Sequence, residues 1–355
     1  MTSLNRKIGA WTGEKRLPEL LSVQYGLKLQ EVEPVEGVLK LYTNEGIYVL
    51  KRVPKEMTEY LYLLIELAEH TPFVTVPIHT IRNKPYFDGF CHRYCLLSWT
   101  DTYSPRSFQH VTDWIAATEA IADLHAQTRN FKEKKNYKLI QKDHTWKIEW
   151  EKDYKQIEIF NVAARYTPNP TPLDHHWLKA AAYTTGLVES IIQHYEKLNG
   201  DEAWQNSYAL GKVCHGNLHR KNILFDQQNQ IKFIDWNQVR LDSRMYDLTK
   251  WIWYAYGKTG SLPMMKQILQ RYHQNVPIQE SEFTLMYLRS LYPEQLIHTL
   301  KLAYHEGSDN SKDWGSKMKQ IMEQEKQKVD VLKQLMPQIE ENFVVQIPLI
   351  TWIHQ

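Results

Sequence analysis

The sequence predicts an α+β fold with two lobes: a small, mostly antiparallel β-sheet lobe with one helix over residues 1–98, and a larger, mainly helical lobe over residues 99–355. Alternating apolar residues and turn signals concentrate in the first range. Apolar residues at helical spacing dominate the second range. A chain of 355 residues is also long enough for two lobes that share a cleft.

A hairpin is the clearest element of the small lobe. The apolar runs Gly37–Tyr42 and Ile47–Val53 flank the polar turn 43–46, which is the pattern of two antiparallel strands. A helix is predicted before the hairpin, around Leu17–Tyr25. Lys51 lies on the second strand of the hairpin, where kinases keep the lysine that contacts nucleotide phosphates.

The hairpin leads into a helix predicted over residues 55–70. Its core stripe recurs at helical spacing and comprises Met57, Leu61, Leu64 and Ala68. Two further strands are predicted at 74–81 and 90–98, separated by a turn at Asn83–Pro85. Residues 96–101 would then form the hinge between the lobes.

Helical spacing organises the larger lobe. Val111–Thr128 is predicted as its central helix. Helices are also predicted at 245–256, 264–274, 282–292, 294–305 and 312–336. Residues 129–175 form a polar insertion with Lys, Tyr and Trp side chains, closed by three prolines. We expect this insertion to bind an acceptor, to act as a lid or to form an assembly surface.

The segment Val213–Asn222, VCHGNLHRKN, has the spacing of a phosphotransferase catalytic loop. Such loops place a His, then an Asp that acts as base, then an Asn that holds a metal, and a second metal-binding Asp follows after a strand. His215, Asn222 and Asp235 occupy three of these four places. The base position holds Asn217, and an amide cannot accept a proton near neutral pH.

Asn222 and Asp235 are the predicted metal ligands. Two short apolar runs joined by a polar turn separate them, and an antiparallel hairpin would bring its two flanking positions together. Mg²⁺ takes oxygen ligands and keeps several waters, so one carboxylate and one amide suffice. The alternative is an ordinary surface hairpin whose flanking polar residues form turns.

Lys51 needs an acid to orient it, and Glu66 in the middle of the following helix is the predicted partner. Glu69 is a second candidate, whereas Glu59 lies too early in the helix. A solvated helix carboxylate is the alternative reading of Glu66. The hairpin is preceded by no glycine-rich phosphate loop, since only Gly37 is available there.

At these residues the chain resembles the aminoglycoside phosphotransferase/choline kinase branch of the protein-kinase-like fold, whose loop reads H-G-D-x-x-x-x-N and whose metal strand reads I-D-W or I-D-F. Arg244–Leu248 resembles that family's short Asp-Leu element, which implies that Asp247 supports the catalytic loop from a helix. Over residues 20–306, the layout and the Tyr48–Arg52 strand are similar to the spore-coat kinase-like proteins of spore-forming bacilli, the CotS/YsxE/YutH group.

This resemblance implies a bilobal kinase-like fold of the aminoglycoside phosphotransferase type, with Mg²⁺ and ATP or another nucleoside triphosphate as cofactors. It also implies spore-coat proteins as partners and the spore coat as the final location after cytoplasmic synthesis. Asn217 replaces the family's catalytic Asp and puts catalysis in doubt, while His215 keeps its place in the loop. A positioned base contributes about 10²–10⁴ in rate, so slow activity could survive its loss.

Two functions follow from these residues and from the resemblance. The first is a spore-coat pseudokinase that retains Mg-nucleotide binding and has impaired catalysis. The second is an active small-molecule phosphotransferase acting on the hydroxyl or amine of an unknown acceptor, since a pure scaffold does not need Lys51, Asn222 and Asp235. A protein kinase is disfavoured, because I-D-W replaces D-F-G and the glycine-rich loop is missing.

The composition excludes several other classes. A formal net charge of +2 with no concentrated basic stripe argues against nucleic-acid binding. We expect no membrane span, because no apolar run approaches the ~20 residues required, and no signal peptide, because the first residues are polar. The three cysteines fit neither a disulfide framework nor a zinc site.

Overall fold

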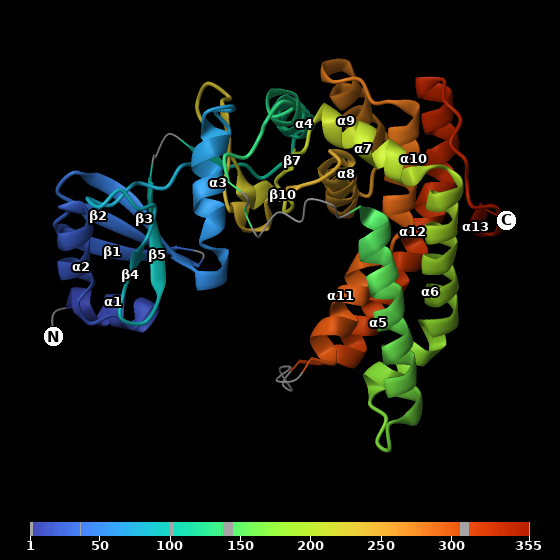
Figure 1. Ribbon diagram of the computed structural model, residues 1–355, viewed down its shortest axis with the longest axis horizontal. Helices are drawn as coiled ribbons and strands as arrows, with labels where there is room; N and C mark the ends of the chain where they lie inside the picture. Colours follow the sequence, from blue (N-terminus) through green and yellow to red (C-terminus); the bar gives the residue numbers. More distant parts are fainter. Residues whose placement is uncertain are drawn as a thin grey trace. The chain divides into compact units, whose positions relative to one another are not determined.

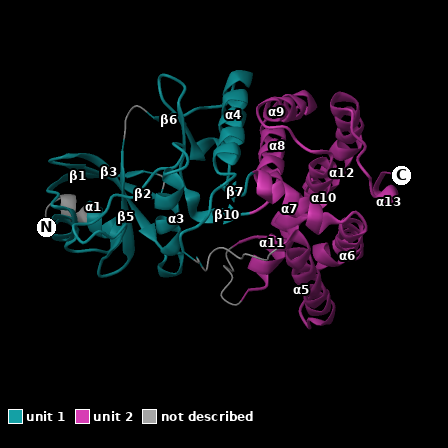
Figure 2. Cartoon of the chain, turned by 45° about the horizontal axis from the view of Figure 1, so that its top comes forward, with its two compact units in different colours: residues 1–141, 211–241 teal, residues 142–210, 242–355 magenta. Residues whose placement is uncertain are grey.

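The computed structural model describes residues 3–35, 37–99, 103–135, 137, 145–305 and 312–354. The chain divides into two compact units (Figure 2). Unit 1 comprises residues 1–141 and 211–241, and unit 2 comprises residues 142–210 and 242–355. The lobe boundary expected after residue 98 does not coincide with this division and stays a prediction.

Unit 1 begins with a five-stranded sheet of order β1-β2-β3-β5-β4, in which every pairing is antiparallel (Figure 1). Its strands are β1 (Leu29–Val35), β2 (Val38–Thr43), β3 (Gly46–Val53), β4 (Phe87–Asp88) and β5 (Arg93–Ser98). The predicted hairpin is β2–β3, whose register pairs Leu41 with Tyr48 and Thr43 with Gly46. Lys51 on β3 pairs with Cys95 on β5.

Two strand predictions need correction. Residues 74–81 form no strand, and only isolated bridges join Val74 to Phe233 and Pro77 to Leu97. Pro77 has no amide hydrogen and so cannot donate to a continued ladder. Conversely, β1 is not predicted from the sequence, because the strand is rich in polar residues and contains Pro34. It is an edge strand, where a proline is tolerated.

The helices α1 (Ser3–Thr12) and α2 (Leu17–Tyr25) share one apolar core with this sheet. The segment between them is also fixed to the sheet. Glu14 is buried and accepts hydrogen bonds from the backbone N–H groups of Phe90, Cys91 and His92, at 3.0, 2.7 and 3.3 Å. The N-terminal segment therefore holds the turn that precedes β5.

The helix predicted over 55–70 is observed as a short 3₁₀ turn, Lys55–Met57, followed by α3 (Glu59–Ala68). The rest of unit 1 contains α4 (Val111–Gln127), as predicted, and short strands. These are β6 (Ser104–Pro105), β7 (Val213–Cys214), β8 (Ile223–Phe225), β9 (Ile231–Phe233) and β10 (Arg240–Leu241). They form a three-stranded sheet of order β6-β8-β9 and a β7–β10 pair.

The regular elements among the described residues of unit 2 are all helices (Figure 1). Its helices are α5 (Trp146–Tyr166), α6 (Pro172–Lys197), α7 (Gly200–Leu210), α8 (Met245–Thr259), α9 (Leu262–Asn275), α10 (Glu280–Leu291), α11 (Glu294–Ala303), α12 (Trp314–Phe343) and α13 (Thr351–His354). A buried ion pair crosses this core, since both Arg244 and Glu282 have fully buried side chains and their closest atoms lie 2.6 Å apart.

Four of these helices differ from expectation. Much of the predicted insertion 129–175 is the helix α5, and α6 and α7 lie where the sequence led to no element. A capping box at Thr171 and Asp174 begins α6. The last long helix continues to Phe343 with Pro337 inside it, beyond the end predicted at residue 336. Its buried Met318 and Met336 agree with packing on unit 2.

Candidate functional site

The two predicted metal ligands flank one hairpin of unit 1. In β8–β9, Ile223 pairs with Phe233, and the N–H of Ile234 donates to the carbonyl of Asn222 at 3.0 Å. Asn222 therefore lies beside Ile234, the residue before Asp235. The structure thus brings the two positions to the same end of the hairpin, as the sequence predicts.

The loop before this hairpin requires glycine at one position. Gly216 has a φ of +81°, in the left-handed region. A Cβ atom there would lie 2.1 Å from the carbonyl oxygen of Gln238, far inside van der Waals contact. The loop therefore passes directly against the segment that follows Asp235, and only a residue without a side chain allows this approach.

Gly216→Ala is expected to destabilise the protein by about 1–3 kcal/mol from the backbone strain alone, with the steric clash adding to it. The measurement is the thermal melting temperature. Gly257→Ala is the matched control, because Gly257 is an exposed residue of α8 with open space at its Cβ position. It should leave stability unchanged or raise it by about 0.5–1 kcal/mol. Equal melting temperatures for the two variants would contradict the tight approach.

His215 holds the backbone of the site. Its Nε2 lies 2.9 Å from the carbonyl oxygen of Ile234, and its Nδ1 accepts from the N–H of Asn217 at 3.2 Å. Both bonds form together only when the proton is on Nε2 of a neutral imidazole. The ring is fully buried. His215 therefore ties the loop to the residue preceding Asp235, and neither ring nitrogen is directed at a substrate.

The asparagines of the loop are held differently. The Nδ2 of Asn222 donates to the carbonyl of Asn217 at 3.0 Å, so the amide oxygen of Asn222 is the atom left for a ligand. Asn217 is fixed through its backbone at both ends. Its half-buried side chain makes no hydrogen bond to any other described residue. Replacing the Asn217 amide with a carboxylate would therefore break no side-chain hydrogen bond.

Lys51 contacts the carboxylate of Asp235, a predicted metal ligand. Its Nζ lies 2.5 Å from Oδ1 of Asp235 and donates to Oδ1 of Asn237 at 2.8 Å. The Nδ2 of Asn237 donates in turn to Oδ1 of Asp235 at 2.8 Å. The side chain of Lys51 is 16% exposed and that of Asp235 38%. Lysine, carboxylate and amide thus form a closed triad, which is the centre of the candidate site.

Asp235 adopts a left-handed conformation, with φ +64° and ψ +52°. Aspartate and asparagine enter this region more readily than most residues. The turn brings Asn237, two residues later, back onto the Asp235 side chain. The sequence did not identify Asn237 as a site residue. The sequence signal that could have identified Asn237 is its polar side chain two positions after Asp235, the predicted metal ligand.

The predicted pairing of Lys51 with Glu66 is not present. Glu66 lies near the end of α3 and is buried, but its carboxylate accepts from the hydroxyl of Tyr137 at 2.5 Å and from the N–H of Lys134 at 2.9 Å. Glu69, the second candidate, forms an exposed ion pair with the Nζ of Lys134 at 2.6 Å. Lys134 and Tyr137 therefore bind these two acids, and Asp235 is the acidic partner of Lys51.

Glu66→Gln is expected to change nucleotide affinity by no more than about threefold, because Glu66 does not contact Lys51. The variant should instead lower the melting temperature, since its amide nitrogen cannot accept one of the two hydrogen bonds, a loss of about 1–3 kcal/mol. Nucleotide titration and thermal melting measure the two effects. A loss of affinity as large as that of a Lys51 variant would show that Glu66 serves Lys51 in the nucleotide-bound protein.

Two further residues complete the comparison with the sequence predictions. Asp247 lies in the first turn of α8 in unit 2 and is fully buried, so it is no solvated helix-start residue; its support of the loop stays a prediction.

His219 is half-buried in unit 1. Burial lowers its pKa, the charge of Asp235 raises it and that of Lys221 lowers it, with a net decrease. His219 is therefore neutral near pH 7.

The residues present fit a hard divalent cation. Oδ2 of Asp235 and Oδ1 of Asn222 accept no hydrogen bond from the described residues. They supply one carboxylate and one amide oxygen, the ligand types that Mg²⁺ prefers. The predicted hinge, residues 96–101, lies in part outside the described residues, so its last two positions have no structural account.

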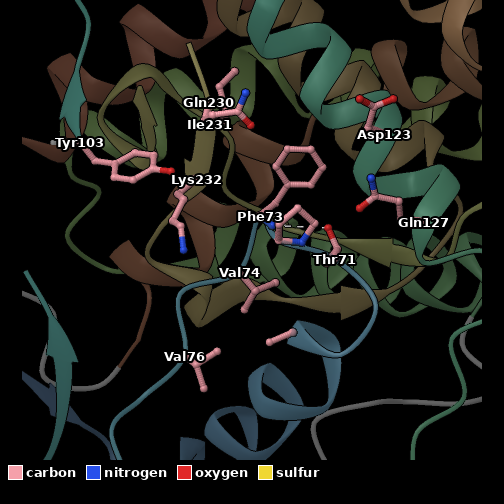
Figure 3. A pocket seen from close by; sticks show the side chains of 12 residues that line it. Thr71, Phe73, Val74, Val76, Tyr103, Asp123, Gln127, Gln230, Ile231 and Lys232 are labelled. Atoms are coloured by element: carbon pink, nitrogen blue, oxygen red, sulfur yellow. Dashed lines mark hydrogen bonds between the residues drawn. The ribbon is translucent and has the colours of Figure 1, made fainter. Parts of the chain in front are cut away.

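Unit 1 also has a pocket of about 500 Å³ away from this triad (Figure 3). Its walls come from residues 71–76, α4 and the β8–β9 hairpin, with Tyr103 and Lys232 on one side and Asp123 and Gln127 on the other. None of the predicted catalytic or metal-binding residues lines it. The pocket is therefore separate from the candidate site.

Comparison with known proteins gives a family and a fold. The family model described as "Spore coat putative kinase YutH" matches residues 18–335. An aminoglycoside phosphotransferase from Alicyclobacillus acidocaldarius superposes with a TM-score of 0.70 at 15% identity, covering 92% of this chain and 97% of that one.

Two other solved structures agree. The choline kinase LicA from Streptococcus pneumoniae gives a TM-score of 0.57 at 14% identity, covering 88% and 98% of the two chains. Spectinomycin phosphotransferase APH(9)-Ia, solved with ADP and spectinomycin, gives 0.55 at 14% identity, covering 86% and 94%. At such identities these likenesses show the fold, and the predicted fold class is confirmed: kinase-like, with an antiparallel sheet in the first part and mostly helices in the rest.

Proposed function

Because the chain belongs to the YutH family of spore coat kinase-like proteins, we propose that it is a coat-associated protein that binds a Mg-nucleotide with impaired catalysis. The proposed phosphate contact is Lys51, and the proposed metal ligands are Asn222 and Asp235. The base position is Asn217, which cannot take a proton. Coat proteins as partners belong to the same proposal.

One observation carries the nucleotide part of this proposal: the direct contact between Lys51 and Asp235. Phosphoryl transfer sites need a cation on the phosphate oxygens close to the metal-binding carboxylate. These two residues are far apart in the sequence and come from a strand of the five-stranded sheet and from the end of another hairpin. Their meeting supports a phosphate site, because a lysine on an outer surface would not lie against this carboxylate with only 16% of its side chain exposed.

Each residue has a separate task in the proposal. A bound Mg²⁺ would neutralise and orient the nucleotide phosphates. Lys51 donates to phosphate oxygens, and Asp235 and Asn222 present the oxygens that hold the ion. His215 and Gly216 keep the loop against the Asp235 segment. The amide of Asn217 cannot remove a proton from an acceptor, so phosphoryl transfer to that acceptor is slow.

Related structures support a nucleotide as the ligand. Spectinomycin phosphotransferase APH(9)-Ia has been solved with ADP and with AMP, and LicA with AMP. No helix among the described residues is both long enough and apolar enough to cross a bilayer. The coat location rests on the family alone.

Isothermal titration of the protein with MgATP tests the proposal. We expect saturable binding with an affinity in the micromolar to millimolar range, about −8 to −4 kcal/mol. A parallel thermal-shift titration should raise the melting temperature, because a ligand that binds only the folded protein stabilises it. No heat and no shift at saturating nucleotide would mean that the site is vestigial.

An active small-molecule phosphotransferase is the second candidate. It is favoured by the intact triad partners Lys51 and Asp235 together with Asn222, which a pure scaffold does not require. An amide at residue 217 can still orient an acceptor hydroxyl, and loose transition states need little early proton removal. Appreciable ATP-dependent phosphorylation of a hydroxyl or amine by the unmodified protein would favour this candidate.

A further inference from the structure

The triad of Lys51, Asp235 and Asn237 balances its own charge. One oxygen of Asp235 receives both the ammonium of Lys51 and the amide of Asn237. Asn237 uses both ends of its side-chain amide, because its oxygen accepts from Lys51 while its nitrogen donates to Asp235. A carboxylate in place of this amide could accept from Lys51 but could not donate to Asp235.

The titratable groups that face the triad add no negative charge. Burial raises the pKa of Cys95, which pairs with Lys51 across the sheet, to about 12, although the charge of Lys51 lowers it. Burial also raises the pKa of Tyr60. His219 has a lowered pKa, as described above. The charge of Lys221, which also acts on His219, is positive, so the negative charge at the triad is that of Asp235, paired with Lys51.

This balance bears on why phosphotransferase sites need a divalent ion. Several carboxylates that face nucleotide phosphates repel them, and the ion removes this repulsion. Here the base position (Asn217) and Asn237 both carry amides. The remaining carboxylate, that of Asp235, is already paired with Lys51. The phosphates would therefore meet a site without net negative charge.

We infer that Asn237 is a positioning residue that keeps this site neutral, so that nucleotide affinity depends little on a divalent ion. The inference rests on the proposed nucleotide site. Asp235 and Asn222 can still ligate an ion, but the ion adds little to affinity because Lys51 and Asn237 already meet the charge of Asp235. Introducing a carboxylate at residue 237 would place two like charges side by side and create a need for a cation between them.

Calorimetric titration with ATP, in excess Mg²⁺ and in EDTA, tests the inference. For the unmodified protein, the two dissociation constants should agree within about threefold. For Asn237→Asp, the constant in EDTA should be weaker than that in Mg²⁺ by on the order of tenfold or more. Gln227→Glu is the matched control, because it adds the same charge at an exposed position in the turn of the β8–β9 hairpin; its ratio should equal that of the unmodified protein.

The outcomes separate this inference from the proposed function. Binding by the unmodified protein only in Mg²⁺ overturns the inference and leaves the nucleotide site standing. No binding in either condition overturns the proposed function and the inference with it. An Asn237→Asp ratio equal to that of the unmodified protein overturns the role of Asn237. If Asn237→Asp does not fold, the ratio of the unmodified protein alone still decides whether the ion matters.

Discussion

Lys51→Ala is expected to weaken nucleotide binding by about ten- to a hundredfold. A hydrogen bond to a charged group contributes about 1.5–3 kcal/mol, and each 1.4 kcal/mol is a factor of about ten in affinity. The variant also leaves the Asp235 carboxylate without its cation, so the carboxylate would repel incoming phosphates. Calorimetric titration with ATP measures the change.

Lys28→Ala is the matched control for this prediction. Lys28 is an exposed lysine of unit 1, and its described hydrogen bonds, both with Asn44, use its backbone N–H and C=O and leave the side chain out. Its replacement removes the same formal charge and should leave affinity unchanged within error. If both variants bind as the unmodified protein does, the nucleotide does not use the triad.

Asn217→Asp is expected to raise ATP turnover by about 10²-fold or more, within the 10²–10⁴ that a positioned base contributes. The change is nearly isosteric. The Asn217 side chain makes no hydrogen bond to another described residue, and its backbone is held by His215 and Asn222. The new carboxylate would therefore enter a loop that is already in place. Release of phosphate from ATP measures the rate, since water can replace the unknown acceptor.

The double variant Asn217→Asp/Asp235→Asn is the control for contaminating activity. It retains the restored base and removes the carboxylate that the proposal assigns to the metal, so the gain in turnover should disappear. A single variant no faster than the unmodified protein, with unchanged melting temperature and nucleotide affinity, would show that the missing base does not limit the reaction.

Much of the fold follows from local patterns in the sequence. The β2–β3 hairpin, α3 and α4 have strong periodicity and clear turns, and each is found where predicted. Strand β1 and the irregular segment 74–81 were misread because their structure depends on tertiary contacts. A polar edge strand carries little alternation, and Val74 reaches the β9 strand by a single bridge.

The part of the candidate site that depends on local structure could also be predicted. Asn222 and Asp235 are related by one local hairpin, so their approach follows from spacing. Which acid pairs with Lys51 depends on tertiary contacts between segments that are distant in the sequence. Tyr137 and Lys134 donate hydrogen bonds to the Glu66 carboxylate. No sequence pattern relates these two segments, so this contact could not be predicted. Asn237 was missed because its role appears only once the left-handed turn at Asp235 directs it backwards.

The central claim is that Lys51 and Asp235 bind the nucleotide phosphates. Its most direct test is a crystal structure of the protein grown with ATP and Mg²⁺. The account predicts phosphate density within hydrogen-bonding distance of the Nζ of Lys51, beside the Asp235 side chain. Nucleotide density elsewhere, for example in the pocket next to Phe73 and Lys232, with the Lys51–Asp235–Asn237 triad intact and unoccupied, would contradict it.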